Sequence, residues 1–381
     1  MSRFSIIVLA AALALSACSG KGKVREPAEL QEISAPALTV KTAWTRNTGD
    51  GADGQWTGLT VVPAVDAVFT ADVSGNVTAW APDTGEAIWT VETGARLISG
   101  PTLSGASLLF GTRDAEVIAL ARADGSEQWR TTLTAEVLAP PATDGTLVVA
   151  RAGDGRVYGL SAVSGERRWV YDRSVPSLTL RGLSAPVLFS GAALVGHDNG
   201  RITALRMDEG TPIWEQVVAL PSGRTELDRI TDIDAQPLIV GENLIAVSYG
   251  GELVSLNLRN GEISWRRSIR SHTGVAAAGG RVFVTDDDGL VWSLDLDSGA
   301  AAWSSEALKY RQPSAPVVHQ GRILVSDFEG YLHWLDAETG EIVARTRAGS
   351  ERLIGGPVVD GDRVYALSMN GKLRVFEPIV R

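Results

Sequence analysis

A glycine and a tryptophan four residues apart recur along the chain, and this repeat limits the possible folds more than any other feature. The pairs are Gly85/Trp89, Gly125/Trp129, Gly165/Trp169, Gly210/Trp214, Gly261/Trp265 and Gly299/Trp303. A seventh copy, from Gly340 to Ala344, keeps the glycine but has no tryptophan. A small residue stands ten positions before each glycine, and successive copies follow at about 40 residues. A fixed period of this length is typical of a solenoid or a propeller.

Each repeat reads as a series of short β-strands. In the last copy, Pro357 opens an apolar strand, and the alternating stretch from Arg363 to Ser368 follows a turn. Asn370-Gly371 favours a hairpin, because both central residues of a type I′ turn need positive φ. Lys372 to Phe376 forms a third strand, and complete copies continue into a fourth strand that carries the tryptophan. Four strands per repeat predict a propeller blade.

The number of repeats predicts how the ring closes. Seven units are complete, and the unit that begins at Pro357 ends with the chain before its fourth strand. The missing strand stands at the other end, where Val40 to Thr45 carries Trp44 without a preceding half-repeat. We therefore expect an all-β, eight-bladed propeller of four-stranded antiparallel blades, whose N-terminal strand closes the last blade. Closure would remove the unpaired edges that promote aggregation.

The repeat resembles the pyrroloquinoline-quinone type of propeller repeat. The stretches that carry the resemblance are A-P-D-T-G-E-A-I-W, residues 81–89, and L-D-A-E-T-G-E-I-V-A, residues 335–344. In that family the tryptophan packs between adjacent blades, and a large flat side chain on an outer strand can fill the wedge between two twisted sheets. We interpret the repeated tryptophans as packing residues.

The first residues resemble the signal sequence of a bacterial lipoprotein. Arg3 precedes a short apolar stretch, Ile6 to Leu15, and Leu15-Ser16-Ala17-Cys18 resembles a lipobox. The apolar stretch is too short for a stable membrane span. Cys18 is the only cysteine of the chain, so an internal disulfide is excluded. The resemblance implies cleavage before Cys18, acylation of that residue and, with Ser19 next, sorting to the outer membrane.

The sequence therefore divides into three parts. We predict a signal peptide over residues 1–17, a lipidated cysteine with a flexible tether over 18–38, and the propeller over 39–381. The lipid would be the only contact with the membrane, at the periplasmic face of the outer membrane. Loss of residues 1–17 removes one arginine and changes the net charge from −10 to −11. An acidic surface argues against nucleic acid as a partner.

Candidate catalytic residues are few. The four histidines are His197, His272, His319 and His333, and their spacing matches no metal-binding motif. Gly49-x-Gly51-x-x-Gly54 fits the dinucleotide fingerprint, but no helix follows it. Asp286-Asp287-Asp288-Gly289 lacks the later glutamate of a calcium loop and is interpreted as a solvated turn. We expect no catalytic residue, no metal and no cofactor.

Two long connectors between repeats carry the best candidate binding residues. They span 17 residues from Trp169 to Pro186 and 23 residues from Trp214 to Pro237. Both would lie on one face of the ring, on either side of the fourth blade. Their sequences hold apolar residues beside arginine and aspartate, which favours a protein-binding patch. The alternative is that the apolar residues fold back onto the rim. These residues are Leu178, Leu180, Arg181, Leu227, Ile230, Asp232, Ile233 and Asp234.

The lipobox, the eight repeats and the loops S-L-T-L-R-G and T-E-L-D-R-I-T-D-I-D together resemble the BamB family, lipoproteins of the outer-membrane β-barrel assembly machinery. The resemblance implies a non-catalytic scaffold that binds the periplasmic POTRA domains of BamA and offers a surface to unfolded outer-membrane proteins. Its contact positions fall on Leu178, Leu180 and Arg181 in the first loop and on Asp232 and Asp234 in the second. Thr179 and Leu183 depart from the expected pattern of the first loop.

Two other functions stay open at this point. One is a periplasmic sensor or ligand-binding propeller with a site in the central channel. The other is a quinoprotein-like enzyme, because quinoprotein dehydrogenases share this repeat. Those enzymes are longer, and they typically place a vicinal cysteine pair over the cofactor. With Cys18 as its only cysteine, this chain cannot supply that pair.

Overall fold

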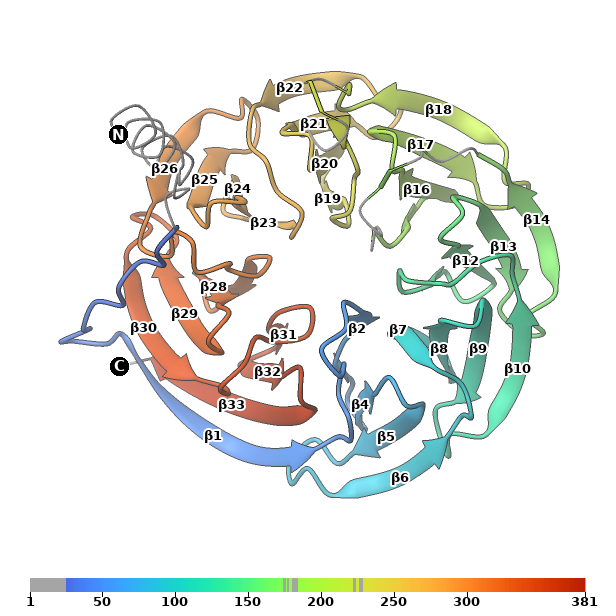
Figure 1. Ribbon diagram of the computed structural model, residues 1–381, viewed down its shortest axis with the longest axis horizontal. Helices are drawn as coiled ribbons and strands as arrows, with labels where there is room; N and C mark the ends of the chain where they lie inside the picture. Colours follow the sequence, from blue (N-terminus) through green and yellow to red (C-terminus); the bar gives the residue numbers. More distant parts are fainter. Residues whose placement is uncertain are drawn as a thin grey trace, which may run out of the picture.

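Eight sheets surround a central axis in the computed structural model (Figure 1). The structure describes residues 25–173, 176, 178–179, 184–221, 224–225 and 229–380. These residues form strands and turns, and none of their segments is a helix long and apolar enough to span a bilayer. Neighbouring strands within each blade are antiparallel, and their order in the sheet goes from the channel to the rim. The prediction of an all-β, eight-bladed propeller is therefore confirmed.

The first four blades follow one another along the chain, each from its inner to its outer strand. The first blade consists of β3 (Val62–Pro63), β4 (Val68–Ala71), β5 (Asn76–Trp80) and β6 (Ala87–Glu92), and the second of β7 (Leu97–Ser104), β8 (Ser107–Thr112), β9 (Glu116–Ala121) and β10 (Glu127–Thr132). The third consists of β11 (Ala142–Thr143), β12 (Leu147–Arg151), β13 (Val157–Ser161) and β14 (Arg167–Tyr171). The fourth consists of β15 (Val187–Phe189), β16 (Ala192–Gly196), β17 (Arg201–Arg206) and β18 (Pro212–Val217). A short extra strand, β2 (Gly58–Leu59), pairs in parallel with β7 on its channel side.

Blades five to eight repeat the same order, except that the last is built from both ends of the chain. The fifth blade consists of β19 (Leu238–Val240), β20 (Asn243–Val247), β21 (Leu253–Asn257) and β22 (Ile263–Arg267), and the sixth of β23 (Val275–Ala278), β24 (Arg281–Thr285), β25 (Val291–Asp295) and β26 (Ala301–Ser305). The seventh consists of β27 (Val317–His319), β28 (Arg322–Ser326), β29 (Tyr331–Asp336) and β30 (Ile342–Arg347). The eighth consists of β31 (Val358–Asp360), β32 (Arg363–Leu367), β33 (Lys372–Val380) and β1 (Leu38–Asn47).

The pairing of β1 with β33 closes the ring, as the split repeat predicts. Nine residue pairs join the two strands, from Leu38 opposite Val380 to Asn47 opposite Lys372. The Trp44 indole then donates a hydrogen bond to the carbonyl oxygen of Pro82 in the first blade, at 2.8 Å. The N-terminal strand therefore contacts both the last and the first blade, and Figure 1 shows it in blue along the rim.

The repeated tryptophan and glycine meet across each junction between blades. Each of seven indoles donates to a carbonyl oxygen in the third-to-fourth-strand turn of the following blade, at 2.6–3.2 Å. The ring of Trp265, for example, lies against Gly299, where a Cβ atom would be 2.6 Å from Cδ2 and Cε3 of the indole. Gly299 also has a φ of 66°, which disfavours any other residue. The tryptophans are packing residues, as predicted.

The split blade explains why one copy of the repeat has no tryptophan. The outer strand before this blade carries Ala344 at the tryptophan position, and Ala344 is buried. The third and fourth strands of the next blade come from opposite ends of the chain, so no turn joins them and no glycine lies there. Leu38, at the start of β1, fills the space in a cluster with Ala344 and Phe376.

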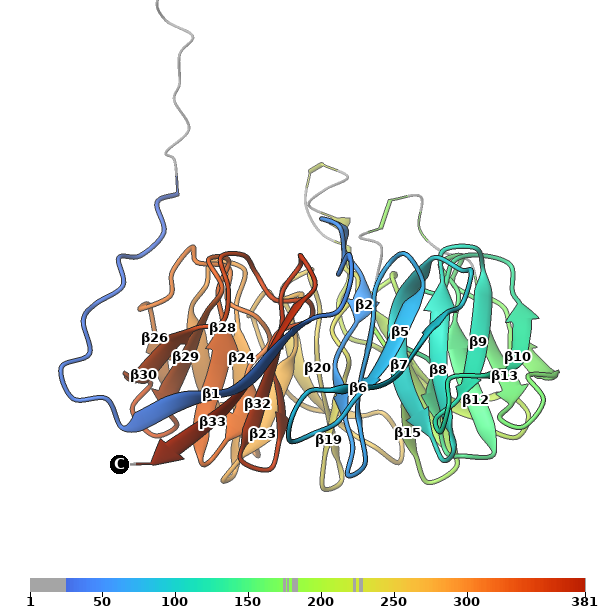
Figure 2. The same cartoon turned by 90° about the horizontal axis from the view of Figure 1, so that it is seen from below.

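The described parts of the connectors from an outer strand to the next inner strand lie on one side of the ring, together with the turns between second and third strands. We call this side the connector face; it lies at the top of Figure 2.

The loop of Gly49, Gly51 and Gly54 lies on the connector face, and no helix follows it. The amide of Ala52 in this loop donates a hydrogen bond to the carbonyl of Met369. In the Asp286 turn, the carboxylate accepts hydrogen bonds from two backbone amides and the Trp292 indole, so the turn interpretation is confirmed.

The segment before β1 differs from the flexible tether expected over residues 18–38. Its described part, residues 25–37, lies against the seventh blade and is joined to it by backbone hydrogen bonds of Ala28 and Ala37. Leu30 packs in the apolar cluster between the sixth and seventh blades. The expectation is wrong for this part, because apolar and hydrogen-bonding contacts with distant strands are not visible in its polar, proline-containing sequence.

Candidate partner-binding site

The two long connectors flank the fourth blade on the connector face, as expected. The first runs from β14 to β15 and the second from β18 to β19. On the first connector, the side chain of Leu178 is 43% exposed. Leu180 and Arg181 lie outside the described residues. On the second connector, Leu220 is 72% exposed, and the sequence analysis did not single it out. The exposed apolar residues described on these connectors are thus Leu178 and Leu220.

The end of the second connector is packed into the ring. Ile230, Asp232 and Ile233 are buried, and Ile233 belongs to the apolar cluster between the fourth and fifth blades. For these residues the fold-back alternative holds, and the expectation of an exposed patch is wrong. Leu227 lies outside the described residues. The role of Asp232 and Asp234 in binding a partner stays a prediction, and in this conformation the Asp232 side chain has no exposed surface.

Backbone hydrogen bonds hold this end of the connector between neighbouring blades. The amide of Ile233 donates to the carbonyl of His197 in the fourth blade, at 3.3 Å. The amide of Tyr249 in the fifth blade donates to the carbonyl of Asp232, at 2.9 Å. The Ser184 hydroxyl, at the end of the first connector, donates to the carbonyl of Ala235 at 3.1 Å. The two connectors are therefore joined directly to each other as well as to the ring.

Three carboxylates meet at the end of the second connector. One oxygen from each of Asp198, Asp232 and Asp234 lies within 4.8 Å of the other two. Arg151, from the end of β12, forms an ion pair with Asp198, and both side chains are 5% exposed. Oxygens at this spacing could ligate a divalent cation, but Arg151 already supplies a positive charge. The sequence analysis missed Arg151 and Asp198, because nothing in their local sequence indicates their proximity to the connector.

The protein environment shifts the pKa values of two side chains at this cluster. Burial raises the pKa of Asp234 to about 7, and the negative charges of Asp232 and Asp198 act in the same direction. Burial also lowers the pKa of His197 to about 3, helped by the positive charges of Arg151 and Arg173. His197 is therefore neutral at physiological pH, whereas Asp234 is half protonated near pH 7. The charge of this cluster therefore changes as the pH passes through about 7.

Asp234→Asn is expected to stabilise the protein at pH 8 more than at pH 5. The folded-state pKa of Asp234 lies above its unfolded value, so folding favours the protonated carboxyl, and stability is lost as pH rises through about 7. An amide cannot ionise and escapes this loss. A shift of this size corresponds to a gain on the order of 2–4 kcal/mol at pH 8. Denaturant unfolding at both pH values measures the difference.

The matched control is Asp297→Asn, which neutralises an exposed aspartate on the opposite face. Its effect on the free energy of unfolding should stay within about 0.5 kcal/mol at either pH. A gain from Asp234→Asn that is equal at pH 5 and pH 8 would contradict the raised pKa.

The closed ring with indole-to-turn contacts at its blade junctions defines a β-propeller of the pyrroloquinoline-quinone repeat class. The family described as outer membrane protein assembly factor BamB matches residues 73–305 and 307–378. The chain belongs to this family.

Relatives carry the same description. The outer membrane protein assembly factor BamB of Alkalilimnicola ehrlichii is 44% identical over 319 residues, which cover 83% of this chain and 82% of the relative. The protein of that name from Escherichia coli is 39% identical over 74% of each chain. The crystal structure of BamB from Moraxella catarrhalis aligns with a TM-score of 0.82 and 27% identity, covering 89% of this chain and all of that one.

The ring is also similar to that of an enzyme, but only in its fold. A europium-containing methanol dehydrogenase aligns with a TM-score of 0.73 over 89% of this chain and 93% of the enzyme, at 14% identity. Membership of a family of assembly factors favours the scaffold over the quinoprotein-like enzyme. The shared sheets therefore establish a common architecture and no common reaction.

Proposed function

We propose that this protein is a non-catalytic scaffold of the outer-membrane β-barrel assembly complex. It is anchored by lipid at Cys18 to the periplasmic face of the outer membrane and binds the POTRA domains of BamA. The observation that carries the proposal is 44% identity to an outer membrane protein assembly factor over 83% of the chain. In this role the ring assists the folding and insertion of outer-membrane proteins by holding the POTRA domains, and it offers a surface to their unfolded chains.

The geometry supports a rigid surface for such a partner. The end of the second connector is fixed by contacts with the fourth and fifth blades, which limits the ordering entropy that the exposed part of the connector loses on binding. Leu178 and Leu220 present exposed apolar surface on the same connectors. Arg181 supplies a cation for a carboxylate of the partner. The buried carboxylates contribute by fixing the connector, and Asp234 retains part of its surface.

Replacing Leu178 and Leu180 by serine, or Arg181 by alanine, should weaken binding to BamA without unfolding the ring. Truncating one member of a desolvated charged pair costs about 2–5 kcal/mol of affinity, which corresponds to at least a thirtyfold weaker complex by the usual conversion of about 1.4 kcal/mol per tenfold. The measurement is recovery of barrel-assembly subunits with the tagged protein from native membranes, followed by titration with purified POTRA domains.

Val163→Ser provides the matched control, because Val163 is 86% exposed on the face opposite the connectors. This variant should bind as the unaltered protein does. Full binding by the variants at residues 178, 180 and 181, with an unchanged unfolding transition, would refute the proposed surface. Failure to recover any barrel-assembly subunit with the unaltered protein would refute the proposed function itself.

A further inference from the structure

Residues 25–37 lie along the rim of the seventh blade, from one face of the ring to the other. The amide of Ala28 donates to the carbonyl of Lys309, at 2.9 Å, on the connector face. The amide of Ala37 donates to the carbonyl of Val343 at the start of β30, at 2.8 Å, near the opposite face. Figure 2 shows this blue segment rising from β1 past the rim to the connector face. We call residues 25–37 the anchor strap.

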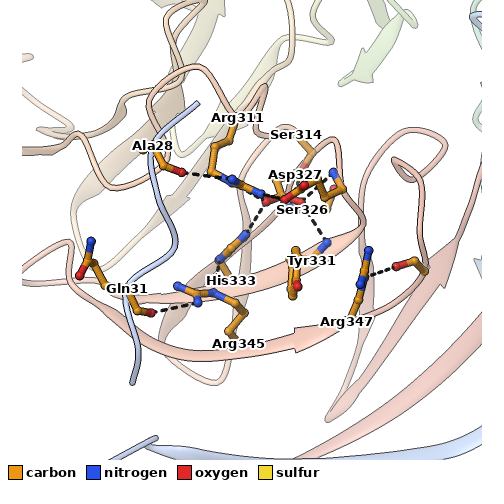
Figure 3. Close-up of polar contacts among 12 residues, drawn as sticks. Ala28, Gln31, Arg311, Ser314, Ser326, Asp327, Tyr331, His333, Arg345 and Arg347 are labelled. Carbon is orange, nitrogen blue, oxygen red and sulfur yellow. Dashed lines mark hydrogen bonds and ion pairs between the residues drawn. The ribbon is translucent and has the colours of Figure 1, made fainter. Parts of the chain in front are cut away.

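Two arginines of the ring hold the strap by its backbone (Figure 3). Nη1 of Arg311 donates to the carbonyl of Ala28, at 3.1 Å, and Nη1 of Arg345 donates to the carbonyl of Gln31, at 3.0 Å. The Arg311 side chain is only 6% exposed. Charged donors make stronger hydrogen bonds than neutral ones, and partial burial reduces competition by water.

A buried network within the seventh blade positions both arginines. Nε of Arg311 donates to Asp327 at 2.8 Å, and Nε of Arg345 donates to Nδ1 of His333 at 3.2 Å. Nε2 of His333 therefore carries the proton and donates to Asp327, at 3.1 Å. Burial lowers the pKa of His333, although Asp327 acts in the opposite direction, so the imidazole stays neutral. The ring thus presents preorganised donors to the strap, and Figure 3 shows the chain of contacts.

Apolar and ionic contacts secure the strap further. Leu30 packs against the buried cluster that contains Leu308 and Leu335, between the sixth and seventh blades. At the end nearest the N-terminus, Arg25 forms an ion pair with Asp288, at 3.0 Å, and its guanidinium lies 5.4 Å from the centre of the Tyr310 ring. The strap is therefore held at both faces and at its middle, and Arg25 stands on the connector face.

We propose that the anchor strap fixes the orientation of the ring on the lipid bilayer, with the connector face on the membrane side at the sixth and seventh blades. This inference rests on the proposed lipid anchor at Cys18. Arg25 lies only seven positions after Cys18, and a fully extended chain of seven residues spans about 25 Å. With the strap detached, Leu38 lies 20 positions after Cys18, and an extended chain of that length would reach about 70 Å. The docked strap therefore keeps the connector face close to the bilayer.

The test compares two fluorescent labels on the lipidated full chain. Cys18 is the only cysteine and is blocked by the lipid, so Ser350→Cys and Val163→Cys each give one labelling site. Ser350 is exposed on the connector face and Val163 on the opposite face. The protein is reconstituted into vesicles of phosphatidylethanolamine with a minor fraction of phosphatidylglycerol and an acceptor-labelled lipid. Energy transfer from each label reports its distance from the bilayer.

The docked strap predicts greater energy transfer from residue 350 than from residue 163. In Ala28→Pro with Leu30→Ser, which removes the amide donor and the apolar contact, this difference should be lost. Glu29→Ser changes an exposed neighbour in the same strap and should keep it. Equal transfer from both labels in the unaltered protein, or a difference that survives in the double variant, would overturn the proposal. If Cys18→Ala protein stays in the membrane fraction, the lipid anchor has failed instead.

Discussion

Removing the chain through Thr48 is expected to cause the largest loss of stability of any change considered. The deletion removes β1, so β33 loses nine paired residues and the last blade becomes an open edge. It also removes the buried Trp44 indole and the Arg46 guanidinium, which donates to the carbonyls of Gly85 and Thr84 in the first blade. Loss of a buried tryptophan alone costs about 3–5 kcal/mol. Thermal unfolding should shift to a much lower temperature and lose cooperativity.

Two point variants separate closure from a general effect of shortening the chain. Trp44→Ala should lower the free energy of unfolding by about 3–5 kcal/mol, because it leaves a cavity at the junction of the last and first blades. Lys41→Ala, at an exposed position of the same strand, should change it by less than about 0.5 kcal/mol. Closure by β1 would be refuted if the deleted protein unfolded at the same temperature as the intact one.

A single methyl group at a junction glycine is expected to be almost as damaging. In Gly299→Ala, the new Cβ would lie 2.6 Å from the Trp265 indole, on a residue with a φ of 66°. The left-handed backbone costs about 1–2 kcal/mol for alanine, and forcing an atom into a packed site costs about 1–3 kcal/mol more. Denaturant unfolding should therefore show a loss of about 2–5 kcal/mol.

Gly279→Ala isolates the backbone part of this cost. Gly279 has a similar φ of 57°, and among the described residues no atom lies within 4 Å of a Cβ placed there. Its loss should be limited to about 1–2 kcal/mol. If both variants lost the same amount, the indole contact would contribute nothing and the blade junctions would need another explanation.

The ring could be predicted from the sequence because its determinants are periodic. Turn glycines and outer-strand tryptophans mark each blade at fixed spacing, and the orphan strand around Trp44 indicated the closure. Even the irregular copy at Ala344 has a physical reason, since the split blade has no third-to-fourth-strand turn for an indole to contact. Such features depend on local turn chemistry and on contacts between neighbouring repeats, which recur at every junction.

The connectors and the anchor strap could not be predicted in the same way. Whether Ile233 is exposed depends on its fit between the fourth and fifth blades, and no sequence period reports that fit. The meeting of Arg151, Asp198 and Asp234 joins three separate blade edges. Likewise, the polar segment around Ala28 is held by two arginines, 283 and 314 positions further along the chain than the residues they contact. Within the part of the chain that the structure describes, each of these contacts occurs once, so no repetition in the sequence indicates it.

The closure of the ring by its two ends also has a consequence for the order of events during synthesis. Val380, the partner of Leu38, emerges from the ribosome 342 residues later (380 minus 38). β1 therefore stays unpaired until the whole chain has been made and, for the proposed location, exported, and synthesis alone takes roughly 20–70 s at about 5–20 residues per second. During that interval Trp44 and the open strand are available to other chains. The charged side chain of Lys41, within β1, makes the strand a poor template for foreign strands while it waits.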